Sequence, residues 1–125
     1  QISNIKRELI KVQKDLFEIG SALAQSEIKN LDQRVKGFEK IIDEMTGELP
    51  PLQNFILPGG GKAGSLLHFA RTVCRRAERR VVALSEKESV DQEVIIYLNR
   101  LSDLLFTMAR FINYKEKKKE IVWPA

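Results

Sequence analysis

The sequence has few residues of the kinds that build disulfide frameworks or metal centres. It contains one cysteine, Cys74, and one histidine among 125 residues. This argues against a disulfide scaffold and against a site built from several cysteine and histidine ligands, and it is typical of a reducing compartment. No apolar run approaches the ~20 residues that a membrane-spanning helix needs. The content of 43% hydrophobic and 30% charged residues instead predicts a single globular domain over residues 1–125.

Alternating strand patterns of useful length are also absent, whereas apolar residues recur in steps of three and four. The first two apolar stripes predict one helix from Ile2 to Leu23 and a second helix from Ile28 to Leu49. We expect the second helix to stop at Pro50, because proline lacks an amide hydrogen and blocks the preceding helical turn. Only a short loop around residues 24–28 is left between these two helices.

A loop rich in proline and glycine at residues 53–61 separates this helical hairpin from a second one. The stripe that we expect to face the core in the third helix comprises Leu66, Ala70, Val73, Ala77 and Val81. That of the fourth helix comprises Val94, Leu98, Leu101, Leu105, Met108 and Ile112. Ser65 and Ser89 are expected to cap these two helices. The predicted fold is all-α, a four- to five-helix bundle with a ferritin-like, up-and-down arrangement.

The most unusual segment is residues 71–80, which hold five arginines and one glutamate. Arg71, Arg75 and Arg79 recur every four residues, so a helix would project them from one face as planar donors for phosphate or carboxylate oxygens. A polyphosphate fits this arrangement, in keeping with the net charge of +4. The competing interpretation is a solvated basic face partly neutralised by Glu78, and spacing alone favours that interpretation.

The predicted fourth helix carries a second, polar face beside its apolar stripe. Asn99, Asp103, Phe106 and Arg110 follow its spacing, and Ser102 lies near its edge. Such a seam can line a ligand cleft, where an amide and a carboxylate bind ribose hydroxyls or orient arginines. It can equally be a salt-bridge network in which Asp103 pairs with an arginine of the third helix. The pattern leaves both interpretations open.

Three features of the loop and of the helix after it are interpreted mainly as structural. Residues 58–65 lack the order of a phosphate-binding P-loop, and no strand precedes them, so they are interpreted as a flexible connection. His68 lies among apolar residues and is expected to pack in or near the core. Phe55 is an aromatic residue on a loop, where it either plugs the end of the bundle or contacts a large planar ligand.

Several motifs in a fixed order are more specific than any of these features alone. They are Glu48-Leu49-Pro50-Pro51, residues 54–60, residues 67–80 and residues 97–103. From about the middle of the first helix to the tail, the sequence resembles the PduO-type ATP:cob(I)alamin adenosyltransferases. The resemblance implies an enzyme that transfers the 5′-deoxyadenosyl group of Mg-ATP to Co(I) of cobalamin, giving adenosylcobalamin and triphosphate. It also implies a homotrimer with each active site between two subunits.

The resemblance assigns catalytic roles to Arg71, Asp103 and Phe55. Arg71 matches an arginine that forms a salt bridge to an aspartate in the N-terminal region of the neighbouring subunit. Asp103 is expected to orient arginines. Phe55 matches the aromatic residue beneath the corrin, where it displaces the lower axial base and gives a four-coordinate Co(II) species that is easier to reduce.

The resemblance assigns ATP binding to the positions of the arginine-rich helix and of the polar seam. Arg75 matches a residue that binds phosphates, with Arg76 as an accessory. Glu78 matches the glutamate near adenosine and the Mg²⁺ ion, and Asn99 matches the residue that contacts ATP. Ser102 continues the same motif and is expected to contact the corrinoid.

One part of the family pattern is absent from this sequence. The glycine- and threonine-rich ATP loop and the first bundle helix of the family would precede Gln1, so we expect a missing N-terminal segment. We also expect missing residues near the loop from Ala24 to Ile28. The resemblance further implies a cytoplasmic location, or the mitochondrial matrix in a eukaryote, with a reductase and a cobalamin-dependent acceptor enzyme as possible partners.

A second function from a different class is a non-enzymatic basic helical module that binds nucleic acid or an acidic protein. Two features of the sequence argue against it. The charges of the third helix are interleaved with apolar residues, and the sequence lacks the combination of aromatic and basic residues typical of nucleic-acid binders. Neither nucleic acid nor a membrane is therefore an expected partner.

Overall fold

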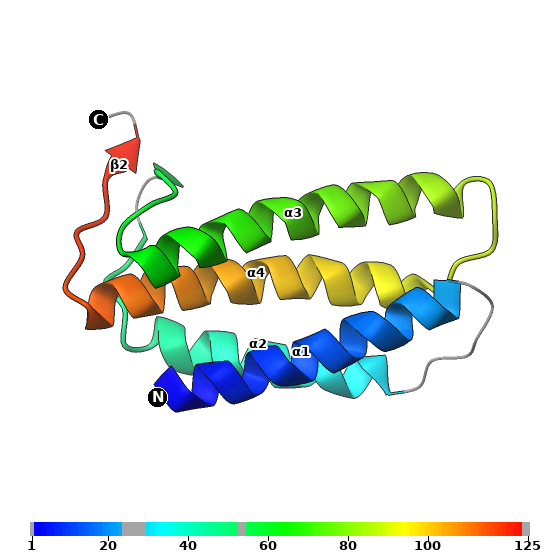
Figure 1. Ribbon diagram of the computed structural model, residues 1–125, viewed down its shortest axis with the longest axis horizontal. Helices are drawn as coiled ribbons and strands as arrows, with labels where there is room; N and C mark the ends of the chain where they lie inside the picture. Colours follow the sequence, from blue (N-terminus) through cyan, green and yellow to red (C-terminus); the bar gives the residue numbers. More distant parts are fainter. Residues whose placement is uncertain (1, 24–29, 53–54, 124–125) are drawn as a thin grey trace.

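The computed structural model describes residues 2–23, 30–52 and 55–123. Four helices make up most of it: α1 (Ile2–Leu23), α2 (Leu31–Thr46), α3 (Lys62–Ser85) and α4 (Gln92–Lys115). They lie side by side with alternating direction, α1 and α3 running one way and α2 and α4 running back (Figure 1). The predicted all-α, up-and-down bundle is therefore confirmed for the described residues. None of their helices is long and apolar enough to span a bilayer.

Helix α4 lies at the centre of the bundle (Figure 1) and packs against α3 on one side and α2 on another. Fourteen of its 24 residues are buried, so it is enclosed on more than one face. All six residues of its predicted stripe are among them. Tyr97, Leu104 and Met108 are fully buried, and full burial of a large apolar side chain contributes about 1.5–3 kcal/mol.

Helix α1 is joined to the rest of the bundle partly by a polar network. The Arg34 guanidinium of α2 donates to Glu8 at 2.9 Å and to Asp15 at 2.7 Å, both on α1. The Tyr97 hydroxyl of α4 also donates to Asp15, at 2.8 Å. Burial, followed by this hydrogen bond, raises the pKa of Tyr97, so the phenol remains a donor. Because these groups are buried or half-buried and mutually satisfied, the network fixes α1 relative to α2 and α4.

The boundaries of the first hairpin differ in detail from the prediction. Helix α2 ends at Thr46, and a turn separates it from Pro50, so the proline follows the end of the helix and does not itself stop it. The predicted start at Ile28 and the short loop around residues 24–28 lie outside the described residues.

Both predicted caps of the second hairpin are wrong. Helix α3 begins after Gly61, and Ser65 lies inside its first turn, where its amide donates to the Gly61 carbonyl at 2.9 Å. Helix α4 is capped by Asp91, whose carboxylate accepts from the amide of Glu93 at 2.9 Å. Ser89 lies two residues too early for this contact, because a capping side chain reaches only the amides two or three residues ahead.

The predicted inner stripe of α3 is partly wrong. Leu66 is 58% exposed and Val73 is 39% exposed. The buried apolar residues are Leu67 and Cys74, each one residue further along than predicted, and Val81, for which the prediction is confirmed. Helix α3 carries apolar residues on two faces, and only the face next to α4 is covered. Periodicity alone does not distinguish the two faces.

A two-stranded sheet closes one end of the molecule. Strand β1 (Phe55–Ile56) pairs antiparallel with β2 (Val122–Trp123), with Phe55 opposite Trp123. The Leu57 amide extends the pairing by donating to the Ile121 carbonyl at 2.8 Å. Strands of two residues have no alternation that a sequence pattern can reveal, and this sheet was therefore not predicted.

We predict that the Cys74 thiol is unreactive until the protein unfolds. It is buried, it donates to the Leu98 carbonyl at 3.3 Å, and burial, followed by the charge of Glu78, raises the pKa of Cys74 to about 11. At pH 8 an aromatic disulfide reagent should modify no thiol in the native protein and one thiol in denaturant. A Thr72→Cys variant adds an exposed thiol on the same helix and should react at once. Rapid modification of native Cys74 would contradict the packing of α3 on α4.

Candidate functional site

The arginine-rich part of α3 borders an open pocket of about 290 Å³ next to α4. Its lining comprises Arg75, Glu78, Arg79, Val82 and Asn99. Positions three and four apart lie on one helical face, which is why the predicted spacing places these α3 side chains together. Both arginines are exposed, whereas the glutamate and the asparagine are half-buried. The pocket therefore offers cationic donors around an anchored polar floor.

Glu78 and Asn99 begin a hydrogen-bonded chain that runs along α4. The Asn99 amide donates to Glu78 at 3.1 Å across the two helices, and its oxygen accepts from Arg100 at 2.7 Å. Arg100 in turn pairs with Asp103 at 2.8 Å. The predicted polar seam of α4 is thus a network, but Asp103 pairs within its own helix and forms no ion pair with a described arginine of α3.

Arg71 does not line the pocket, although it continues the same ladder of arginines. Its guanidinium carbon lies 5.0 Å from the centroid of the Phe106 ring. Its Nε is buried and has no hydrogen-bond partner among the described residues. Burial, followed by the charge of Arg75, lowers the pKa of Arg71, while Asp103 opposes the shift. A buried donor of this kind calls for an acceptor from outside the described part of the chain.

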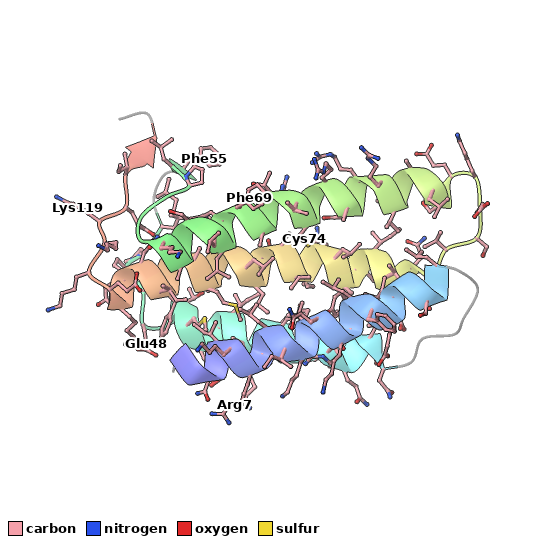
Figure 2. All side chains as sticks on the ribbon, in the orientation of Figure 1. Arg7, Glu48, Phe55, Phe69, Cys74 and Lys119 are labelled. Atoms are coloured by element: carbon pink, nitrogen blue, oxygen red, sulfur yellow. The ribbon has the colours of Figure 1, made fainter. Side chains whose placement is uncertain are left out.

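Phe55 lies at the end of the bundle where α3 begins (Figure 2), and its ring is 83% exposed. The arginine pocket starts at Arg75, roughly 20 Å along α3 from its first residue at ~1.5 Å per residue, and Phe55 is not among the residues that line it. The structure therefore does not bring Phe55 and the pocket together. Between them, Leu66 and Phe69 are 58% and 66% exposed and extend the apolar surface along α3. Sequence reasoning did not single out these two residues as functional.

Two other predicted site residues, Ser102 and Arg76, do not line the arginine pocket. Ser102 is 1% exposed, and its hydroxyl donates to the Asn99 carbonyl at 2.7 Å within α4. It offers no surface for the expected corrinoid contact, because it lies on the core side of the polar seam. Arg76 is exposed and does not line the pocket. Arg79 does line it, and the repeat of arginines every four residues was the signal that identified it.

The prediction for His68 is confirmed, since this side chain packs in the core. It is 4% exposed and meets the Phe106 ring edge-on, with centroids 5.8 Å apart. Burial, followed by the charge of Arg71, lowers the pKa of His68, which favours the neutral imidazole. A neutral, enclosed ring of this kind supports packing and not catalysis.

The described residues contain no group of three acidic, histidine or cysteine side chains that could hold a metal ion by themselves. Glu78 is the one carboxylate that lines the arginine pocket. Magnesium commonly binds to one or two carboxylates together with the phosphates of a substrate. The residues present therefore fit Mg²⁺ as a companion of a polyphosphate and not as an independent metal centre.

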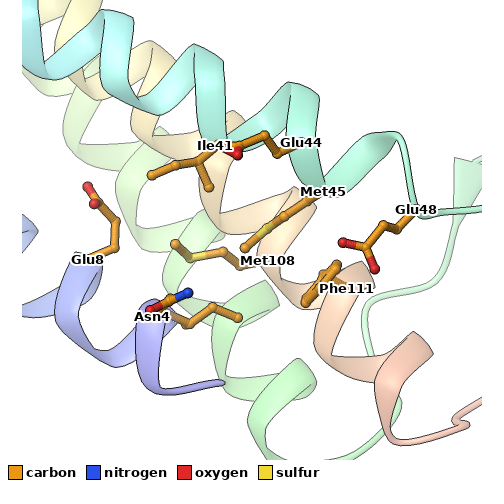
Figure 3. Close-up of a pocket in the computed structure, with 9 residues that line it drawn as sticks. Asn4, Glu8, Ile41, Glu44, Met45, Glu48, Met108 and Phe111 are labelled. Atoms are coloured by element: carbon orange, nitrogen blue, oxygen red, sulfur yellow. The ribbon is translucent and has the colours of Figure 1, made fainter. Parts of the chain in front are cut away.

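A second cavity, of about 250 Å³, lies between α1, α2 and α4 (Figure 3). Glu8, Glu44 and Glu48 border it, above an apolar floor that includes Met45 and Met108. The acidic border is unfavourable for a polyphosphate. The arginine pocket is therefore the better candidate for an anionic ligand.

Comparison with known sequences identifies one family. The cobalamin adenosyltransferase family matches residues 1–112. The corrinoid adenosyltransferase of Bacillus subtilis is 47% identical over 114 residues, which cover 88% of this chain and 59% of that protein. Corrinoid adenosyltransferase MMAB of Homo sapiens is 47% identical over 126 residues, which cover 93% of this chain and 50% of that protein. The chain thus spans 59% and 50% of the length of these two relatives.

Solved structures agree with the sequence comparison. A variant PduO-type ATP:corrinoid adenosyltransferase from Lactobacillus reuteri, complexed with cobalamin and ATP, has a TM-score of 0.91 and 38% identity. The match covers 94% of this chain and 67% of that chain. A second variant, complexed with ATP, has a TM-score of 0.89 and 40% identity and covers 94% of this chain and 69% of that one.

Proposed function

The chain belongs to the cobalamin adenosyltransferase family, and from this premise we propose that the protein transfers the 5′-deoxyadenosyl group of ATP to cob(I)alamin. The electron pair of Co(I) attacks the 5′ carbon of ATP, the carbon–oxygen bond to the triphosphate breaks, and triphosphate leaves with the bonding electrons. Cobalt becomes formally Co(III) in adenosylcobalamin. The observation that carries the proposal is the pocket in which two arginines, a glutamate and an asparagine converge.

In this proposal the triphosphate binds at the arginine pocket. Arg75 and Arg79 supply planar, permanently charged donors for phosphate oxygens, and such charge-assisted bonds are about twice as strong as neutral ones. Asn99 is held by its bonds to Glu78 and Arg100, so its position is set before the nucleotide arrives. Arg76 is exposed beside the pocket and retains only an accessory role.

Mg²⁺ would be held by Glu78 together with phosphate oxygens, and when bound it would neutralise charge on the leaving triphosphate. The single carboxylate in the pocket supports this shared arrangement. The remaining work of Glu78 is to accept from Asn99 and so to fix the amide that faces the nucleotide.

The corrinoid is proposed to lie over Phe55, as the resemblance implies. An 83% exposed aromatic ring on a loop contributes nothing to the described core, and it can displace the lower axial base of cob(II)alamin. A four-coordinate Co(II) species is then easier to reduce to Co(I). Leu66 and Phe69 add apolar surface suited to a large planar ligand.

We further propose a homotrimer with the active site between subunits. The support from this chain is the buried Arg71 Nε, which has no acceptor among the described residues. An aspartate from a neighbouring subunit, as the resemblance implies, would satisfy it. The negative charge of Asp103 opposes the lowering of the Arg71 pKa, and in this proposal Asp103 helps to orient the guanidinium.

The remaining expectations about partners and location stay predictions. A reductase would supply the electron, a cobalamin-dependent enzyme would accept the product, and the location would be cytoplasmic or, in a eukaryote, the mitochondrial matrix. The alternative of a nucleic-acid or acidic-protein module has no support from the comparisons, since the two relatives described above are corrinoid adenosyltransferases by name.

The first prediction from the proposed function concerns the arginine pocket. Replacing Arg75→Ala in the full-length protein should raise the dissociation constant for ATP roughly tenfold or more, since a hydrogen bond to a charged group contributes about 1.5–3 kcal/mol. Arg80→Ala is the matched control, because Arg80 is exposed on the same helix and does not line the pocket. Titration calorimetry measures both. Equal ATP affinity in the two variants would reject the assignment of the pocket to phosphates.

The second prediction separates corrinoid chemistry from nucleotide binding. Phe55→Ala should leave ATP affinity nearly unchanged, because the ring does not line the arginine pocket. Adenosylation from cob(II)alamin should collapse, whereas the loss from chemically prepared cob(I)alamin should be smaller, since that species has no lower ligand to displace. Absorption spectra of cob(II)alamin with protein and ATP report the four-coordinate form. Its full formation by the variant would reject the role of the ring.

The third prediction concerns assembly. Light scattering on the full-length protein at micromolar concentration should give three times the mass of one subunit, because the proposed active site needs a neighbouring chain. The mass of a monomer under these conditions would contradict the trimer, and would leave the buried Arg71 donor without an explanation.

A further inference from the structure

The Phe55 loop is the segment from residue 50 to residue 61, between α2 and α3, described at residues 50–52 and 55–61. The position of Phe55 depends on what anchors this loop, because few of its side chains are buried. The ring is largely exposed, and most side chains on either side of it, including Leu52 and Leu57, are exposed as well. Strand β1 has only two residues and pairs only with β2, which lies in the last segment of the chain. An isolated two-stranded pairing of this size is marginal in water. Other contacts must hold the loop in place.

The end of the loop that follows Phe55 is held by Asn113, a buried residue of α4. Its amide nitrogen donates to the Gly59 carbonyl at 2.8 Å, and its oxygen accepts from the Gly61 amide at 3.1 Å. Gly60 has φ of 110°, and a side-chain carbon at Gly60 or Gly64 would collide with the Asn113 carboxamide. The glycines are therefore required because a side chain from α4 inserts between them.

The end of the loop that precedes Phe55 is held by Arg110, which lies three residues earlier on α4 and is 6% exposed. Its Nη2 donates to the Pro50 carbonyl at 3.1 Å. The same guanidinium grips both carboxylate oxygens of Glu120, at 2.6 Å from Nε and 3.3 Å from Nη2. Glu120 lies just before β2, so one side chain ties together the start of the loop and the strand that pairs with it.

The returning C-terminal segment completes this frame. The Lys118 amide donates to the Asn113 carbonyl at 2.7 Å, which turns the chain back after α4. Figure 1 shows the segment rising from the end of α4 to lie beside β1. There the Leu57 amide donates to the Ile121 carbonyl at 2.8 Å. Both ends of the loop and its pairing strand are thus fixed to the last turns of one buried helix.

We propose that Arg110 and Asn113 are positioning residues that hold the Phe55 loop in the geometry needed to displace the lower base of cob(II)alamin. The inference rests on the proposed function and extends it to residues to which the resemblance gives no role. Neither side chain lines the arginine pocket. Their role is to order the loop before the corrinoid arrives. Ordering the backbone then does not reduce the binding free energy that is available to displace the base.

The test uses Arg110→Lys and Asn113→Ala in the full-length protein, with Lys115→Gln as the matched control. Lysine keeps the charge but cannot reach one carbonyl and two carboxylate oxygens at once. Lys115 also joins α4 to the segment before the loop, through Glu48 at 2.9 Å, but on the exposed surface. Removing that surface pair should have little effect.

Two readouts distinguish positioning from a general structural role. In Arg110→Lys and Asn113→Ala, the hydrogen-exchange rate of the Leu57 amide should rise roughly tenfold or more, as expected when a charged or buried hydrogen bond is lost. The fraction of four-coordinate cob(II)alamin at saturating ATP should fall severalfold, while the ATP dissociation constant stays within about twofold of the parent. The Lys115→Gln protein should match the parent in all three measurements.

Glu120→Gln is an additional variant that tests the proposal even if a substitution in α4 prevents folding. Glu120 lies outside the helices, so the bundle persists, and the neutral amide weakens the grip of Arg110 on the segment before β2. This variant should shift both readouts in the same direction by a smaller factor. Parent-like Leu57 exchange, or a parent-like four-coordinate fraction, in folded Arg110→Lys and Asn113→Ala proteins would overturn the proposal.

The failure of this proposal can be told apart from failure of the proposed function. If the parent protein forms no adenosylcobalamin from ATP and cob(I)alamin, the proposed function fails. If the parent is active and Phe55→Ala loses the four-coordinate signal while the two α4 variants keep it, positioning by Arg110 and Asn113 fails alone. An active parent whose signal is insensitive to Phe55→Ala removes the role of the ring and overturns the positioning proposal with it.

Discussion

The burial of α4 is the constraint on which the rest of the structure depends. A helix enclosed by α2 and α3 can carry polar side chains only where each finds a partner, because an unpaired buried group costs about 1–3 kcal/mol. Tyr97 meets Asp15 of α1, Asn99 meets Glu78 of α3, and Asn113 meets the backbone of the glycine-rich turn. The same helix therefore fixes α1, the floor of the arginine pocket and the Phe55 loop.

The arginine-rich half of α3 is the complementary case, since its charges are not balanced within the described chain. Arg75 and Arg79 face an open pocket with one carboxylate, and the buried Nε of Arg71 has no acceptor there. Like charges spaced along one helical face repel one another. An anion in the pocket and an acidic residue beside Arg71 would both relieve this imbalance, which is the electrostatic reason to expect partners at these two places.

How much the sequence predicts depends on whether an interaction is local in the chain. The core stripe of α4 follows from periodicity alone, whereas two members of the predicted α3 stripe, Leu66 and Val73, are exposed because that helix has two apolar faces. The arginine ladder gave the pocket, but the roles of Asn99 and Phe55 came from resemblance. The contacts of Asn113 could not be predicted, because its partners are backbone atoms more than fifty residues away. The sequence placed Arg110 in the polar seam of α4, whereas its partners in the structure are Glu120 and the Pro50 carbonyl.

The order of residues along α3 is consistent with the proposal that this one helix contacts two chemically different substrates. Its first half exposes Leu66 and Phe69, and its second half exposes Arg75 and Arg79. Large apolar side chains left in water forgo roughly 1.5–3 kcal/mol each, so they favour a planar apolar ligand or a neighbouring chain over solvent. A polyanion is favoured only at the other half. In the proposed reaction, substrates that differ in charge and polarity would thereby bind at different halves of α3, and the reacting carbon and cobalt would meet where the apolar surface gives way to the arginines.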